Sequence, residues 1–126
     1  IIFNLIIYII IMSKSFKSLN NFDKRISQSE KILKKYPDRV PIIIEKHKNS
    51  DISEIDKNKY LVPVDLTIGQ LVFVIRRRIK LEKEKALFIF CNDILPPTSS
   101  LVIDIYNEYK DDDNFLYITY SSENAF

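Results

Sequence analysis

The chain has 126 residues, with nineteen basic and seventeen acidic side chains and a formal net charge of +2. Hydrophobic residues make up 46% and charged residues 29%, which is typical of one globular domain and excludes disorder along the whole chain. A single cysteine excludes a disulfide framework and a multi-cysteine zinc site, and a single glycine excludes a glycine-rich phosphate loop. The composition therefore favours a small binding or adaptor domain over an enzyme, and no cofactor is expected.

The first eleven residues, IIFNLIIYIII, are apolar apart from Asn4 and precede Met12. As a helix they would extend about 16 Å, roughly half the hydrocarbon core of a bilayer. They lack the preceding basic segment and the following small-residue cleavage site of a signal peptide. We expect Met12 to be the natural start and residues 1–11 to be upstream sequence. A membrane-associating extension and a cleaved signal are the alternatives.

A helix is predicted over residues 21–36, with Asp23 as its cap and Pro37 ending it. Its apolar stripe is expected to comprise Phe22, Ile26, Leu33 and Tyr36, with Ile32 beside the stripe and partly exposed. A weaker helix is predicted around residues 14–19. Two strands follow, over 39–46 and 59–64, and are expected to pair antiparallel across a long connection. Pro41 places the first of them at an edge, or marks its first residues.

Thr67 and Gln70 form a capping box that opens the strongest helix of the chain. Its buried face is predicted to be Ile68, Leu71, Val72, Ile75 and Ile79, with Phe73 and Val74 off that face and Arg76, Arg77 and Arg78 closing the helix. Residues 86–91 read as a central strand that is covered on both faces.

After a turn at residues 92–93 and a bend at 96–97, Ser99 or Ser100 is expected to cap a helix that runs to about Tyr109. Residues 111–114 are predicted to be a solvated loop, and residues 115–120 a last strand. The order helix, strand, strand, helix, strand, helix, strand is that of an α+β fold of the β-grasp type.

Catalytic candidates are few. Cys91 and His47 are the only residues that could form a thiol catalyst, and a cysteine at the end of an apolar strand is more often a small buried hydrophobe. Asp111, Asp112 and Asp113 could hold a cation loosely, but a solvated acidic loop is the simpler interpretation.

Charge and apolar residues are more informative. Residues 14–35 carry seven basic and two acidic side chains, and Lys57 and Lys59 add to them. Such a face attracts an acidic peptide, nucleic acid or an anionic membrane, or is simply solvated, and the aromatic–basic interleaving that stacks bases is absent. An apolar surplus remains that exceeds what a domain of this size needs to expose: Ile32, Pro41, Leu61, Val62, Pro63, Leu66, Phe73, Val74 and Phe115. Strand 59–64 could offer an open edge to which an extended peptide adds as a strand, with core packing as the alternative.

Five blocks of sequence point to a known family. They are residues 34–41 (KKYPDRVP), 56–63 (DKNKYLVP), 65–70 (DLTIGQ), 95–99 (LPPTS) and 115–118 (FLYI). Together they resemble the autophagy-related protein 8 family of ubiquitin-like modifiers, nearest to its GABA-receptor-associated-protein branch, over about residues 16–126.

The resemblance implies a ubiquitin-like β-grasp with a four-stranded mixed sheet and two additional N-terminal helices, which divides the chain into 1–11, a helical region over 12–38 and a β-grasp domain over 39–126. Such proteins are monomers joined through a C-terminal glycine to phosphatidylethanolamine, after action by a processing cysteine protease, an activating enzyme and a conjugating enzyme. They bind peptides with an aromatic-x-x-aliphatic motif. They are cytoplasmic, and peripheral on autophagosome or apicoplast membranes once conjugated.

By position, the resemblance implies an aromatic-pocket set of Ile32, Pro41, Lys57, Lys59, Leu61 and Phe115. It implies an aliphatic-pocket set of Arg39, Tyr60, Val62, Pro63, Leu66, Leu71, Val74 and Arg78. Where the family usually has an acidic residue near the first pocket, this chain has Gln28, so its partner selectivity is open. The expected glycine would follow Phe126, and the chain as written should not be lipidated.

Two other classes of function compete with this interpretation. The first is a basic nucleic-acid-binding domain, although no nucleic acid partner is expected, and the second is an enzyme that uses Cys91. A structural tubulin-binding or membrane-tethering role is compatible with the basic N-terminal helices.

Overall fold

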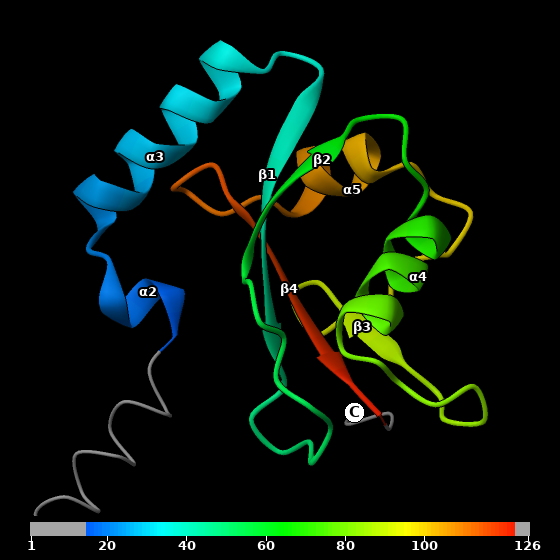
Figure 1. Ribbon diagram of the computed structural model, residues 1–126. Helices are drawn as coiled ribbons and strands as arrows, with labels where there is room; N and C mark the ends of the chain where they lie inside the picture. The colour runs from blue at the N-terminus through cyan, green and yellow to red at the C-terminus, as the bar shows by residue number, and fades with distance from the viewer. Residues whose placement is uncertain (1–14, 123–126) are drawn as a thin grey trace, which may run out of the picture.

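The computed structural model describes residues 15–122 and contains three helices and two strands in its N-terminal two thirds, followed by a strand, a helix and a strand (Figure 1). The elements are α2 (Phe16–Leu19), α3 (Phe22–Lys35), β1 (Arg39–Lys46), β2 (Lys59–Pro63), α4 (Ile68–Arg78), β3 (Phe88–Phe90), α5 (Val102–Tyr109) and β4 (Leu116–Ser121). Their order is the predicted one. The expectations for residues 1–11 and for the end of the chain lie outside the described residues.

The four strands form one mixed sheet in the order β2-β1-β4-β3. β1 pairs antiparallel with β2 and parallel with β4, and β3 pairs antiparallel with β4. Pro41 precedes Ile42, the first residue of β1 that pairs with β4, so its missing N–H interrupts no bond to that strand. The prediction that Pro41 lies among the first strand residues is therefore confirmed, whereas an edge position for β1 is wrong.

The prediction that residues 86–91 form a central strand is also wrong, because β3 lies at the edge of the sheet opposite β2. Ile89 and Phe90 point to opposite faces and are only 4% and 2% exposed. A continuous apolar run indicates that both faces of a strand are covered. It does not indicate how many neighbouring strands pair with that strand.

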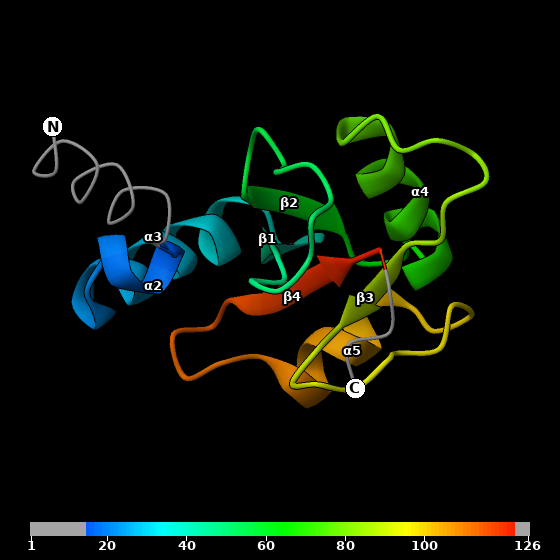
Figure 2. The same cartoon turned by 90° about the horizontal axis from the view of Figure 1, so that it is seen from below.

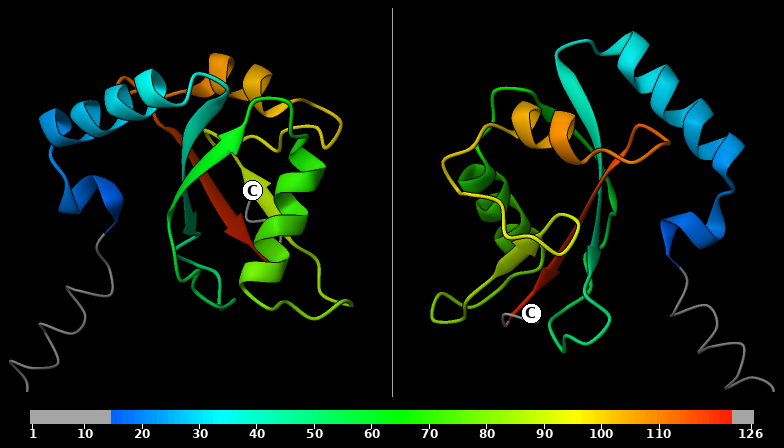
Figure 3. Two further views of the ribbon diagram at one scale, coloured as in Figure 1. Left: turned by 45° about the horizontal axis from the view of Figure 1, so that its top comes forward. Right: turned by 180° about the vertical axis from the view of Figure 1, so that it is seen from behind.

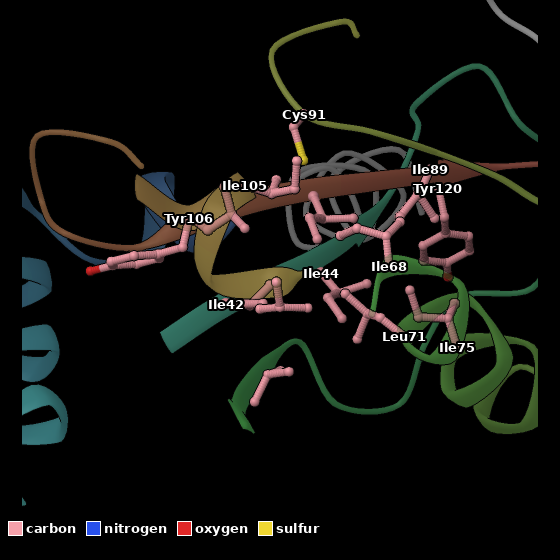
Figure 4. Packing of buried hydrophobic residues seen from close by; sticks show 14 of the residues in the cluster. Ile42, Ile44, Ile68, Leu71, Ile75, Ile89, Cys91, Ile105, Tyr106 and Tyr120 are labelled. Atoms are coloured by element: carbon pink, nitrogen blue, oxygen red, sulfur yellow. The ribbon is translucent and has the colours of Figure 1, made fainter. Parts of the chain in front are cut away.

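The main core lies between the sheet and helices α4 and α5. Ile68, Leu71 and Ile75 of α4 meet Ile44 of β1 and Tyr120 of β4 in Figure 4, and all five side chains are at most 1% exposed. The buried face of α4 is thus the predicted one, with Val72 only partly buried against the core. Thr67 accepts from Gln70 N at 3.2 Å and Gln70 Oε1 accepts from Thr67 N at 2.9 Å, which confirms the capping box.

A second, smaller cluster joins the N-terminal helices to the other face of the sheet, as Figure 2 shows for α2 and α3. It contains Phe16, Ile43 and Phe115, with Ile32 and Tyr117 packed against it, and the rings of Phe16 and Phe115 meet edge to face at 5.2 Å. The arm of α2 and α3 therefore has its own anchoring contacts, separate from the main core.

Two details of α3 differ from the prediction. Its cap is Asn21, whose Oδ1 accepts from Lys24 N at 2.9 Å, and Asp23 lies within the first turn. Phe22 is 46% exposed, and the buried residue of the helix is Ser29. The small Ser29 side chain lets α3 approach the loop before β4, where its Oγ donates to Asp113 O at 2.5 Å.

Helix α5 begins after Leu101 without a side-chain cap, so the prediction of Ser99 or Ser100 as cap is wrong. The segment before α4 supplies backbone acceptors instead: Leu66 O accepts from Val102 N at 2.7 Å and Val64 O from Ile103 N at 3.2 Å. These carbonyls satisfy two of the N–H groups that a helix leaves unpaired at its start, which makes a cap side chain unnecessary.

The loop of residues 111–114 is not fully solvated, because Asp113 is 0% exposed. Asp113 Oδ2 pairs with Arg25 Nη1 at 3.2 Å and accepts from the Tyr117 hydroxyl at 2.5 Å, while Oδ1 accepts from Phe115 N at 2.8 Å. A buried carboxylate needs such partners, and here they come from α3, the loop and β4.

Within residues 15–122, no helix is long and apolar enough to cross a bilayer.

Candidate functional site

The candidate site is centred on β2, which forms one edge of the sheet between α3 and α4 (Figure 3). Successive side chains of a strand point to opposite faces. Tyr60 and Val62 lie across from Ile42 and Val40, which belong to the main core beside α4. The alternate positions, Lys59, Leu61 and Pro63, lie across from Ile43, Pro41 and Arg39, on the face that α3 covers.

The outer edge of β2 carries backbone groups that do not face β1. Asn58 O accepts from Ile44 N at 2.7 Å and Val64 N donates to Asp38 O at 3.1 Å. Since alternate residues of an antiparallel strand bond to the neighbour, Tyr60 and Val62 also face β1, and the N–H and C=O groups of Lys59 and Leu61 point outward. A sheet edge of this kind can accept a further strand.

The structure brings five of the six residues of the aromatic-pocket set to the α3 side of β2, whereas Lys57 lies over the ring of Tyr60 on the α4 side. Leu61 pairs with Pro41, Ile32 packs against the cluster that contains Phe115, and Lys59 reaches α3 through a hydrogen bond from its Nζ to Gln28 Oε1 at 3.0 Å. The expectation that Pro41 and Phe115 belong to an exposed surplus is wrong: Pro41 is buried and Phe115 is 0% exposed. Phe115 packs against Phe16 of the N-terminal arm, and Pro41 lies opposite Leu61 in the sheet, so both lie beneath this surface, whereas Ile32 and Leu61 remain partly exposed.

The aliphatic-pocket set divides in the same way. Val62 and Leu71 are 4% and 1% exposed, because both belong to the main core, so the expected exposure of Val62 is wrong. Tyr60 and Leu66 are partly buried against that core. Pro63, on the α3 face of β2, and Val74, which is 39% exposed, are the exposed apolar members of the set, and Arg39 and Arg78 are exposed as well. Phe73 is 60% exposed on the same helix as Val74, as predicted.

Cations surround Tyr60 at the centre of β2. Lys57 Nζ lies 5.6 Å and the Arg78 guanidinium 5.9 Å from the centre of its ring, and Arg78 also pairs with Asp56 at 3.0 Å. Burial raises the pKa of the Tyr60 hydroxyl although the charge of Arg78 lowers it, so the phenol stays neutral at physiological pH. At the start of β1, the Arg39 guanidinium lies 5.7 Å from the centre of the Tyr36 ring. The site can therefore bind anions beside apolar groups.

The structure also adds Arg25 and Ser29, which the sequence did not connect with the site, and shows which contact Gln28 makes there. Gln28 holds Lys59, while Arg25 and Ser29 hold α3 to Asp113 and so place Gln28 and Ile32 beside β2. On a helix, polar residues at these spacings look the same as a face exposed to solvent. Apart from the acidic residues 111–113, the sequence therefore carried no sign of these contacts.

The environment of Cys91 does not support the catalytic role considered for it. Cys91 is 1% exposed, and burial raises the pKa of its thiol to about 12, which opposes formation of a nucleophilic thiolate. A hollow of about 180 Å³ lies at the loop after α4 and has a mixed polar and apolar lining that includes Asp51, Ile79, Lys80, Glu82 and Ser122.

Comparison with known proteins gives a consistent result. A family model described as "Autophagy protein Atg8 ubiquitin like" matches residues 24–126. The chain is 61% identical over 115 residues to Autophagy-related protein 8 of Lodderomyces elongisporus, a match that covers 91% of this chain and 79% of that protein. It is 59% identical over 115 residues to the Coccidioides immitis protein of the same name, covering 91% of this chain and 98% of that protein.

Solved structures agree in fold. Trypanosoma brucei ATG8 superimposes with a TM-score of 0.82 at 50% identity, covering 86% of this chain and 94% of that one. Plasmodium falciparum Atg8, solved in complex with a Plasmodium falciparum Atg3 peptide, superimposes with a TM-score of 0.83 at 35% identity, covering 90% and 99%. The family model spans most of the chain, the matches cover 79% and 98% of the two relatives, and the fold is the ubiquitin-like α+β fold expected from the five sequence blocks. The chain therefore belongs to the Atg8 family of ubiquitin-like autophagy proteins.

Proposed function

We propose that this protein is a ubiquitin-like modifier without catalysis of its own, which binds extended peptides along the outer edge of β2. The observation that carries the proposal is the outward-facing backbone of Lys59 and Leu61 on an edge strand flanked by two helices. A peptide strand added there would gain main-chain hydrogen bonds from the edge and specificity from the side chains on either side of it.

The two sides of β2 suit different side chains of such a peptide. On the α3 side, Leu61 and Ile32 offer partly exposed apolar surface beside the Lys59 ammonium, which suits an aromatic residue with acidic neighbours. On the α4 side, Leu66 and Val74 offer apolar surface beside Tyr60, which suits an aliphatic residue. This arrangement supports the aromatic-x-x-aliphatic motif.

The proposed partners are cargo receptors that carry this motif and the enzymes of a conjugation relay: a processing cysteine protease, an activating enzyme and a conjugating enzyme. Support for the conjugating enzyme comes from the similar Plasmodium falciparum Atg8, which was solved with an Atg3 peptide. The relay would join a C-terminal glycine to phosphatidylethanolamine and so place the protein peripherally on an autophagosomal or plastid membrane.

The docking proposal is tested by isothermal titration with an acidic peptide that contains Trp-x-x-Leu. We expect a Kd in the micromolar range, about −8 kcal/mol of binding free energy. Leu61→Ala should weaken binding roughly five- to thirtyfold by removing an apolar contact of about 1–2 kcal/mol, and Lys59→Glu should weaken it by placing a carboxylate opposite the acidic residues.

Matched controls lie elsewhere on the surface. Ile94→Ala removes an aliphatic side chain that is 49% exposed in the turn after β3, and Lys48→Glu makes the same charge change in the exposed loop after β1. Both controls should bind as the unaltered protein does. Absence of binding at high concentration refutes peptide docking, and equal binding by Leu61→Ala, Lys59→Glu and the controls shows that the site lies elsewhere.

The conjugation proposal needs a separate test. A chain that carries glycine directly after Phe126 should become linked to phosphatidylethanolamine when incubated with the relay enzymes, ATP and vesicles that contain this lipid. The same chain with alanine in place of that glycine is the control, since a Cβ crowds the approach of an enzyme to the terminal carboxylate. Transfer of the lipid to the alanine chain at the same rate would contradict the mechanism.

A further inference from the structure

The loop between β1 and β2 contains an exposed serine that is followed by acids. Ser53 lies in an irregular stretch of this loop, and Glu54 and Asp56 come one and three residues after it. The side chains of these two acids are 60% and 71% exposed, and they lie 4.0 Å from Lys46 and 3.0 Å from Arg78. Kinases select their substrates by patterns of charge, and acids at these two positions are the pattern that acid-directed kinases bind beside a serine. The segment therefore has the sequence of a phosphorylation site.

Two other serines lack one of the features that Ser53 combines. Ser50, in the same loop, is 6% exposed, and its Oγ accepts from Ser122 N at 3.4 Å. Ser27 is exposed and has Glu30 three residues after it, but it lies within α3. A helix uses its own backbone groups internally, whereas a kinase binds the substrate segment as an extended chain. Ser53 is both exposed and outside any helix or strand.

Ser53 also lines a hollow that carries two ammonium groups. The hollow has a volume of about 180 Å³, and Ser53, Lys80 and Lys85 are among its lining residues. A water molecule needs about 10–15 Å³ of such a volume, so a phosphate group attached to Ser53 has room here. Within residues 15–122, neither Lys80 nor Lys85 takes part in an ion pair within 4.0 Å. Both charges can therefore pair with a phosphate.

The backbone at both lysines is fixed by the end of α4. Lys80 has a φ of 55°, in the left-handed region, and its N donates to Arg77 O at 3.3 Å. Leu81 N donates to Arg76 O at 3.1 Å, which completes a Schellman ending of the helix. The Arg76 side chain then reaches further along the chain, where its Nη1 donates to Lys85 O at 2.8 Å. Because both backbones are set in advance, less conformational freedom is lost when the two lysines bind an anion.

Two acids share the lining and limit the size of the expected effect. Asp51 and Glu82 also line the hollow, so its unmodified lining carries two ammonium groups and two carboxylates. A phosphoserine carries about −1.5 to −2 charges at pH 7 and three strong acceptor oxygens, which is more than either carboxylate offers. The phosphate should therefore compete successfully with Asp51 and Glu82 for the ammonium groups, while repulsion from these acids reduces the gain.

We propose that Ser53 is a phosphorylation site whose phosphate is bound by Lys80 and Lys85 across this hollow. In the modification, Ser53 Oγ forms a bond to the γ-phosphorus of ATP. The bond from this phosphorus to the β–γ bridging oxygen breaks, its electron pair leaves with ADP, and the hydroxyl proton passes to a base of the kinase. The bound phosphate links the loop between β1 and β2 to the segment after α4. The inference goes beyond the proposed function and does not depend on peptide docking.

The position of the phosphate is tested by incubating the folded chain with ATP and an acid-directed kinase of the casein-kinase class. We expect mass spectrometry to find phosphate on Ser53. Ser53→Ala should lose nearly all of the incorporated phosphate, whereas Ser27→Ala should keep it, because α3 withholds Ser27 from the kinase. If the folded chain carries no phosphate on Ser53, the inference is overturned.

Binding of the phosphate by the lysines is tested by phosphorus NMR of the phosphorylated chain at low salt. Its reference is a phosphorylated peptide of residues 47–58, which keeps the neighbouring acids but lacks the hollow. The second pKa of a phosphoserine is about 6, and nearby ammonium groups favour the dianion, so we expect this pKa to be about 0.5–1 lower in the folded chain than in the peptide. The double variant with Lys80→Ala and Lys85→Ala should remove the difference.

The matched control is Lys83→Ala, which removes an exposed ammonium from the same segment but is not part of the lining. The control should keep the lowered pKa. If the folded chain and the peptide have the same pKa, or if the double variant keeps the lowered value, phosphate binding by Lys80 and Lys85 is overturned. An equal loss in Lys83→Ala also overturns it, because the effect would then belong to the overall charge of the segment. All three lysines are exposed, so the variants should unfold within a few degrees of the unaltered protein.

Discussion

The buried carboxylate of Asp113 is the contact on which the position of α3 depends most directly. Asp113→Ala removes the partner of three groups at once: Arg25 Nη1 at 3.2 Å, the Tyr117 hydroxyl at 2.5 Å and Phe115 N at 2.8 Å. The Arg25 side chain is only 12% exposed, so water can replace little of what the variant takes away.

The size of the effect follows from these partners. Removing one member of a buried ion pair costs about 3–5 kcal/mol, and leaving a buried backbone N–H without an acceptor costs about 1–3 kcal/mol. The groups share one site, so their costs do not add, and we expect a loss of about 3–5 kcal/mol. With a urea m-value of about 1.5–2 kcal/mol per molar, this lowers the unfolding midpoint by roughly 2 M.

Urea unfolding monitored by circular dichroism measures this loss, and hydrogen exchange shows where it acts. The amides of α3 should lose protection more than those of β1, because Arg25 and Ser29 attach the helix to the Asp113 loop. In the double variant with Arg25→Met, the unpaired guanidinium is absent, so the combined loss should be smaller than the sum of the two single losses. A midpoint shift equivalent to less than about 1 kcal/mol, or strict additivity in this cycle, would refute the reasoning.

Two further predictions concern ionisation. Burial, the hydrogen bond to Asp113 and the charge of that carboxylate raise the pKa of Tyr117 above the usual value of about 10. The folded chain then keeps a proton that the unfolded chain loses, so the free energy of unfolding should be steady up to about pH 10 and fall above it. Tyr117→Phe should lessen that fall in urea titrations between pH 8 and 11, and an identical slope in the variant would contradict this assignment. Burial also raises the pKa of Cys91 to about 12, so its thiol should resist a disulfide reagent at pH 8 in the folded protein and react rapidly in 8 M urea, whereas equal rates would show that the thiol is accessible.

Local features of the sequence predicted most of the elements. Thr67 and Gln70 predicted the start of α4, because both halves of a capping box lie within one helical turn. The spacing of Ile68, Leu71 and Ile75 predicted the buried face of this helix. The bounds of β1 also followed from its β-branched run. These signals are short in range, so they are readable without knowledge of the partner elements.

The sites that differ from the prediction depend on contacts between distant segments. Ser29 and Asp113 are 84 residues apart, yet their contact buries an aspartate that the sequence placed in a solvated loop. Phe115 and Val62 looked like surplus apolar surface because nothing in their neighbourhood shows that the N-terminal arm and α4 cover them.

The sequence by itself determined the family, the element order and the residues that gather around β2. Only the tertiary structure decided which of those residues form the surface, which strands lie at the edges, and that the charge of Lys59 is held by a neutral amide. The physical reason is that helix and strand patterns arise from hydrogen bonds and side-chain periodicity along the chain. Burial and charge pairing are set by segments that meet only when the chain folds.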